Sequence, residues 1–232
     1  MRTRHLGLLM ALSLTALACG GPDVGEISEQ RVTVTLNAMS SQPTVATVDD
    51  SKGGLSVKRA FVSASAMTLV PCSDDAASIV LTARGYDLLN SPSEEVTTAV
   101  TELCAVQLDL DPVSDAATEG VPDGATLYAE ARDPSDKALS FVSDRSHALR
   151  FEAKGGAALG PSLIIGFDLA LWLTGLPLPP DDAMPPTDMT EAESDLFDSQ
   201  LRSAVALYAD SNENQRLDDD ETTPIAIASA SR

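Results

Sequence analysis

Aromatic side chains are scarce in this chain of 232 residues. They make up 4% of the sequence and include a single tryptophan, Trp172. Exposed aromatic rings form the stacking surfaces on which many proteins bind sugars or single-stranded nucleic acids. The composition therefore does not indicate a binding surface of that kind, and it predicts a core built from valine, leucine, isoleucine and alanine.

Basic residues are also few. The chain has 15 lysines and arginines against 35 acidic residues, which gives a formal net charge of −20. Such a surface repels nucleic acid and anionic lipid. We therefore predict that nucleic acid is not a partner.

The usual sequence signatures of enzymes are missing. We find no G-x-S-x-G, no H-E-x-x-H, no phosphate-binding glycine loop and no dinucleotide fingerprint, so no enzymatic activity is predicted. The residues that would suit catalysis best are His147 and Asp168, a carboxylate inside an apolar run. Structural roles fit the pattern better, because a hydrogen bond to the backbone explains such an aspartate and His147 lies beside a turn.

The apolar run at residues 6–18 is too short to span a membrane. It has about a dozen residues, whereas a helix needs roughly 20 to cross the hydrocarbon layer. Two arginines precede it and Cys19 follows it, which is the order of a signal peptide covering residues 1–18. Residues 16–19, Ala-Leu-Ala-Cys, resemble a bacterial lipobox. The resemblance implies that a lipid on Cys19 anchors the protein to a membrane, and the glycine that follows Cys19 favours the outer membrane. An ordinary secretory leader is the alternative.

Three cysteines would leave one thiol unpaired in an exported protein. Lipidation of Cys19 leaves Cys72 and Cys104. An oxidising compartment would join these two in a disulfide, and the alternative is a pair of buried thiols.

The mature chain divides into four regions by composition. Residues 19–29 contain glycine, proline and acids and predict a flexible tether. Residues 30–174 predict a β domain, residues 175–189 a proline-rich connector, and residues 190–232 a helix, a loop and a tail.

The β domain shows many short strands with turn residues between them. Apolar side chains alternate with threonines at Val32, Val34 and Leu36, which indicates a half-buried strand. Further strands are predicted at 55–70, 78–83, 86–89, 99–110, 126–132, 138–142, 148–153 and 163–173. This pattern favours an antiparallel β-sandwich or barrel.

Three segments resemble bacterial lipoprotein domains of unknown function. They are the run LSVKRAFVSASAMTLVP at Leu55–Pro71, the segment YDLL at 86–89 and the strand end QLDL at 107–110. The resemblance implies an immunoglobulin-like or transthyretin-like β-sandwich without catalytic residues.

A helix is predicted after the connector. Thr190 and Glu193 have the spacing of a capping box. An apolar stripe follows at Leu196, Phe197, Leu201, Ala204, Val205 and Tyr208. We expect this stripe to pack against the sandwich, and a partner protein is the alternative.

The twelve residues 210–221 resemble the calcium-binding loop of the EF-hand family. Side chains at positions 1, 3, 5, 9 and 12 and a carbonyl at position 7 supply oxygen ligands in that family. The corresponding residues are Asp210, Asn212, Asn214, Arg216 through its carbonyl, Asp218 and Glu221. We therefore predict one bound Ca²⁺.

Two features depart from that family, because a second helix is not predicted and Gln215 stands where the family has glycine at a sharp turn. With the loop placed directly after the helix, Asp210 would bring negative charge to the negative end of the helix dipole, which a cation would relieve. The alternative is an acidic, solvated helix end.

Together these observations predict a lipid-anchored cell-envelope protein with a structural or binding role, stabilised by calcium. A ligand-binding or adhesion module for polysaccharide is one alternative, and it predicts an exposed groove around Trp172, Tyr86 or Tyr128. A hydrolase is the other, and it predicts a deep pocket that holds Asp168 beside a second carboxylate.

Overall fold

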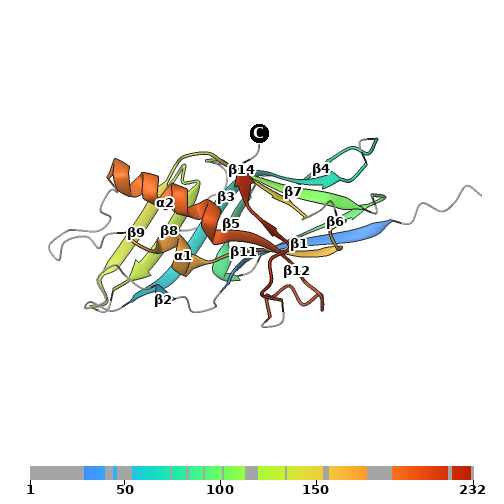
Figure 1. The fold of residues 1–232 in the computed structure, drawn as a ribbon. Helices are drawn as coiled ribbons and strands as arrows, with labels where there is room; N and C mark the ends of the chain where they lie inside the picture. The colour runs from blue at the N-terminus through green and yellow to red at the C-terminus, as the bar shows by residue number, and fades with distance from the viewer. Residues whose placement is uncertain are drawn as a thin grey trace, which may run out of the picture.

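The computed structural model describes residues 29–39, 44–45, 54–73, 75–81, 84–90, 92–100, 102–112, 120–133, 135–153, 157–176, 190–218 and 221–230. Within these ranges two β-sheets pack against each other around one apolar core, and two helices lie at one end (Figure 1). The predicted β-sandwich is confirmed. The predicted leader, Cys19 and most of the tether and of the proline-rich connector lie outside the described residues.

The smaller sheet has five strands in the order β13-β12-β11-β1-β6. Their bounds are β1 Gln30–Ala38, β6 Ser93–Thr98, β11 Ser162–Phe167, β12 Val205–Ala209 and β13 Ala226–Ile227. The strands β1 and β11 are parallel and the other neighbours are antiparallel. The alternation read from the sequence of β1 is present, because Val32, Val34 and Leu36 are all buried.

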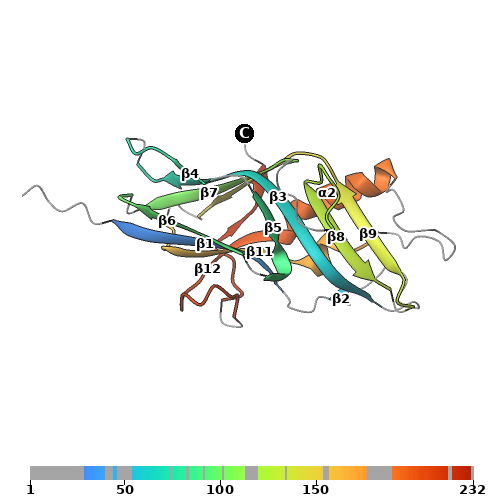
Figure 2. The same cartoon turned by 180° about the vertical axis from the view of Figure 1, so that it is seen from behind.

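The larger sheet has nine strands, and β3, Leu55–Pro71, runs through its middle (Figure 2). The main order is β14-β10-β7-β3-β8-β9. The bounds are β7 Leu103–Leu110, β8 Leu127–Arg132, β9 Ala138–Ser143, β10 His147–Glu152 and β14 Ser229–Ala230. Three short strands also pair with β3, namely β2 Thr44–Val45, β4 Ile79–Leu81 and β5 Arg84–Asp87. A 3-10 turn, η2 Leu88–Asn90, follows β5. Every strand pair in this sheet is antiparallel.

A disulfide joins Cys72, which follows β3, to Cys104 in β7, as predicted. The two Cα atoms are 4.7 Å apart, and the backbone N–H of Cys72 donates to the carbonyl of Glu102. The bridge therefore secures the end of the β3–β7 pairing, at a point where the register shifts between Val70 and Pro71.

The predicted single strand at 163–173 is wrong in its second half. The strand β11 ends at Phe167, and Asp168 begins the short helix α1, Leu169–Leu173. The Asp168 carboxylate accepts a hydrogen bond of 2.9 Å from the backbone N–H of Leu171. An uninterrupted apolar run fits a buried strand and a buried helix equally well, and the N-cap aspartate decides between them here.

The predicted helix begins as expected but ends earlier. It is α2, Glu191–Ala204, and both hydrogen bonds of the capping box between Thr190 and Glu193 are present. Val205 and Tyr208 of the predicted stripe belong instead to β12, because pairing with β11 satisfies the backbone of this segment. The apolar spacing of the helix therefore continues into residues that form a strand.

The helix α2 docks on the sandwich, as predicted. Phe197 stacks on Trp172 of α1 with ring centroids 4.9 Å apart, and the Trp172 indole N–H donates to the carbonyl of Phe197 over 3.2 Å. Phe197 and Leu201 are fully buried. Figure 1 shows α2 beside β9, and the five residues of β12 separate it from the loop that follows β12.

Neither helix in the described part of the chain has the length and apolar character to cross a membrane.

Removing the disulfide should destabilise the fold. The two cysteines are 32 residues apart, and in the chain-entropy model a bridge of that span stabilises by about 3 to 4 kcal/mol. We expect the Cys72→Ala/Cys104→Ala variant to lose about this much free energy of unfolding, measured by guanidinium denaturation. An unchanged denaturation midpoint, or two titratable thiols in the unreduced parent protein, would contradict this expectation.

Candidate functional site

The candidate calcium loop, residues 210–221, leaves the end of β12 and leads to β13. The backbone N–H of Asp210 donates to the carbonyl of Ser162 at the start of β11 over 3.1 Å. The prediction that the loop directly follows the helix is wrong, because the five residues of β12 separate α2 from Asp210. Crowding of charge at a helix end therefore does not bear on this loop.

Asp210 organises the first half of the loop. Its side chain is 4% exposed. One carboxylate oxygen accepts from the backbone N–H of Asn214 at 3.1 Å, and the other accepts from the N–H of Gln215 and the hydroxyl of Ser162, both at 2.9 Å. The carboxylate thus folds the chain back on itself and fixes it to β11.

The remaining predicted ligand side chains lie in the same hydrogen-bonded loop. The Asp218 carboxylate accepts from the side-chain amides of Asn212 and Asn214, each at 2.7 Å. The carboxylate of Glu221, a residue that is 6% exposed, accepts from the backbone N–H groups of Ser211 and Asp218. The backbone N–H of Arg216 donates to Asn214, and the Arg216 side chain is exposed.

The backbone turns sharply at the position where the EF-hand family has glycine. Gln215 has a φ of 62° and Glu213 has a φ of 57°. This left-handed conformation costs on the order of 1 to 2 kcal/mol for a residue with a Cβ. Side chains that accept backbone N–H groups, above all Asp210, offset that cost.

Three carboxylates of the loop, those of Asp210, Asp218 and Glu221, have no basic partner among the described residues. In the same part of the chain, no three His, Cys, Asp or Glu side chains gather as a metal-binding group. Neutral N–H donors therefore surround these negative charges, and the amides of Asn212 and Asn214 are the donors nearest to Asp218.

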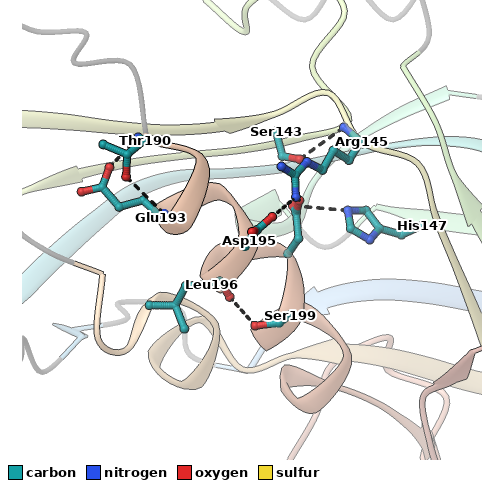
Figure 3. A network of polar contacts seen from close by, with 9 residues as sticks. Ser143, Arg145, His147, Thr190, Glu193, Asp195, Leu196 and Ser199 are labelled. Carbon is teal, nitrogen blue, oxygen red and sulfur yellow. Dashed lines mark hydrogen bonds and ion pairs between the residues drawn. The ribbon is translucent and has the colours of Figure 1, made fainter.

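A second polar cluster holds α2 against the strands β9 and β10. The His147 ring nitrogen lies 3.4 Å from one oxygen of Asp198, and an Arg145 nitrogen lies 3.2 Å from the other. Arg145 also pairs with Asp195, one turn before Asp198 on the same helix (Figure 3). The side chains of His147 and Asp198 are 7% and 9% exposed.

The protonation of His147 is set mainly by its burial. Burial lowers the pKa of His147 below its ordinary value of 6.5, the nearby Asp198 raises it, and the positive charges of Arg202 and Arg145 lower it. The net direction is downward. These contacts hold α2 against the sandwich. Arg145 supplies the permanent positive charge that the buried Asp198 carboxylate requires.

The residues expected to line an exposed groove are buried. Trp172 is 0%, Tyr86 1% and Tyr128 6% exposed, so these rings form no such groove. Burial, together with the Glu94 carboxylate that accepts the Tyr86 hydroxyl at 3.0 Å, raises the pKa of Tyr86 to about 12. Asp168, the candidate for a hydrolase, caps α1.

An open cleft of about 400 Å³ adjoins the candidate calcium loop. Its polar lining includes Arg31, Thr33, Glu95, Ser162, Glu213 and Gln215. No pattern in the sequence indicates this cleft, because the lining residues come from β1, β6, β11 and the loop and meet only when the five-stranded sheet forms.

No family model and no curated protein matches the chain. Among solved structures, MbnP from Methylosinus trichosporium is similar over 62% of this chain and 78% of its own, with 8% sequence identity and a TM-score of 0.37. A similarity of this size carries no inference about function.

His147 should make the stability of the protein depend on pH. Because the pKa of His147 is lowered on folding, the folded state binds fewer protons, and stability present above pH 6.5 is lost as the pH falls below that value. We expect the His147→Gln variant to show a flatter change of melting temperature between about pH 7 and pH 5.

Asp195→Asn is the matched control for this measurement, because it removes a charge from the same cluster without removing the titrating ring. It should keep the pH dependence of the parent protein. Equal slopes for the parent and His147→Gln would refute the role given to His147.

Proposed function

We propose that this is an exported cell-envelope protein, anchored to a membrane by a lipid on Cys19, whose β-sandwich has a structural or binding role and is stabilised by one calcium ion in the loop 210–221. The observation that carries the calcium proposal is the pair of buried carboxylates, Asp210 and Glu221, which have no basic partner within the described ranges. Buried charges are normally paired or bound to a metal.

The donor set of the loop suits calcium. A calcium ion takes six to eight oxygen ligands, and the loop offers carboxylates from Asp210, Asp218 and Glu221 together with two side-chain amides. The amides now present nitrogen to Asp218. A half turn about the terminal bond would present their oxygens instead and would give up the hydrogen bonds that these oxygens accept from the backbone N–H groups of Asn214 and Arg216. A cation would then replace the two amide donors as the partner of the carboxylates.

The place of the loop supports a structural role for the ion. The chain that leaves the loop first pairs with β12 of the five-stranded sheet as β13, and then with β10 of the nine-stranded sheet as β14. These last strands are two residues each. Short strands contribute few hydrogen bonds, so a rigid loop before them would help to hold the C-terminal segment across both sheets.

The anchor is supported by the leader and by the disulfide. The order of charged, apolar and small residues before Cys19 is that of an exported lipoprotein. Disulfides persist in oxidising compartments outside the cytoplasm, and the bond between Cys72 and Cys104 is consistent with export.

Calcium should raise the melting temperature of the protein. A loop of the extracellular type binds with a dissociation constant of about 10⁻⁴ to 10⁻³ M. At about 10 mM calcium this affinity would add roughly 1 to 3 kcal/mol, which corresponds to several degrees. The measurement is a thermal melt with calcium chloride and with magnesium chloride at equal ionic strength.

The variants Asp218→Asn and Glu221→Gln should abolish the increase, because each removes a ligand charge and keeps the shape of the side chain. Glu213→Gln makes the same charge change at an exposed position of the loop that is not a proposed ligand, and it should respond to calcium as the parent does. A parent melting temperature that calcium leaves unchanged would refute the calcium proposal.

The anchor is tested on the protein recovered from a bacterial membrane fraction. We expect mass spectrometry to find a mature chain that begins at acylated Cys19. Replacement of this cysteine in Cys19→Ser should move the protein to the soluble fraction. Recovery of the chain with residues 1–18 intact, or with an unmodified Cys19, would refute the anchor.

A further inference from the structure

The cleft beside the loop is built from rigid parts. Its lining includes Thr33 of β1 and Ser162 of β11, and the Thr33 N–H donates to the carbonyl of Pro161 over 2.8 Å. Ser162 is in turn bonded to Asp210 through both its hydroxyl and its carbonyl. Two sheet strands and the loop therefore form one hydrogen-bonded wall.

The loop contributes two residues to this wall in an unusual backbone conformation. Glu213 and Gln215, the residues with φ of 57° and 62°, both line the cleft. Such strain persists only where the surrounding contacts enforce it. Here the contacts of Asp210 hold the strained segment, so the two side chains are presented to the cleft by a fixed backbone.

The charges of the lining limit the ligands that it can take. Arg31 of β1 and Glu95 of β6 form an exposed ion pair with 3.8 Å between nitrogen and oxygen, and Glu213 adds a second negative charge. An anion would meet two carboxylates on a protein of net charge −20, and a cation would have to compete with Arg31. A neutral ligand that offers both donors and acceptors can bond to all three groups without separating the Arg31–Glu95 pair.

The size and the polar groups of the cleft then define the class of ligand. A volume of about 400 Å³ accommodates one or two sugar rings. Hydroxyl, amide, guanidinium and carboxylate groups are all present in the lining, and each can bond a ligand hydroxyl. None of the described residues that line the cleft is aromatic, so binding must depend on hydrogen bonds in water and should be weak.

We propose that this cleft binds a neutral, polyhydroxylated ligand, namely one or two sugar units of a polysaccharide. The cleft is formed in the structure without any metal, so this proposal goes beyond the calcium and lipid proposals and does not require them. The proposed binding site then lies at the end of the sandwich where β1, β6 and β11 meet the loop.

The experiment is a titration of the ¹⁵N-labelled full chain, in a detergent without a sugar headgroup, followed by NMR. The probes are maltose, cellobiose, lactose and diacetylchitobiose, each up to about 50 mM, because a binding constant in the millimolar range is expected for a few solvent-exposed hydrogen bonds. At least one probe should shift the amide signals of Thr33, Ser162 and Gln215 in a saturable manner.

The variant Arg31→Met should weaken that binding by about fivefold or more, because it removes a charged hydrogen-bond donor from the cleft lining. Arg150→Met is the matched control: Arg150 pairs with Glu152 on the surface of β10, away from the cleft. This control should bind as the parent does.

Each titration is run in EDTA and again in calcium chloride, so that failure of the calcium proposal leaves this test intact. Absence of saturable shifts with all four disaccharides in both conditions overturns the proposal. Equal binding by the parent and Arg31→Met overturns it as well. Tighter binding of digalacturonate than of the neutral disaccharides would overturn the inference that the ligand is neutral.

Discussion

The long strand β3 is the constraint on which the sandwich depends. Its first half pairs with β8 and its second half with β7, while β2, β5 and β4 cover parts of its other edge. Buried backbone N–H and carbonyl groups must be hydrogen-bonded, so a strand of 17 residues at the centre of a sheet requires these neighbours. The disulfide from Cys72 to Cys104 of β7 secures the end of this strand.

The sandwich is then closed by elements from the second half of the chain. The strand β11 inserts beside β1 in parallel, which only a long connection between them allows. Trp172 and Phe197 pack together above the core and bring α1 and α2 to one end. Because β12 follows α2 without an intervening loop, the docking of the helix also sets where β12 begins and where the acidic loop is placed.

The acidic loop and the cleft share one support, which is the contact between Asp210 and Ser162. That contact buries a carboxylate at the edge of the sheet and holds the strained residues beside the cleft. A change in the charge of this loop would therefore affect the cleft through Ser162 and through Glu213 and Gln215, the loop residues that line it. The two proposals concern different ligands, but the same wall of the molecule carries both.

Most of the β domain could be predicted from local pattern. The alternation at Val32, Val34 and Leu36, the length of Leu55–Pro71 and the capping box at Thr190 each reflect an interaction within one element. The errors occur where an element depends on a distant neighbour. The run at 163–173 has no period that separates strand from helix, and Val205 and Tyr208 continue a helical stripe but pair with β11. The strand β6 at Ser93–Thr98 was not predicted at all, because its sequence SEEVTT is polar and it becomes a strand by pairing with β1.

The sequence by itself determined the pairing of Cys72 with Cys104 and the class of the fold, because these depend on residue type, on count and on spacing along the chain. Only the tertiary structure decided that Asp210 follows a strand, that Asp198 meets His147 and Arg145, and that a cleft lies between β1, β6, β11 and the loop. Those contacts join residues that are far apart in the chain, and packing of the two sheets brings them together.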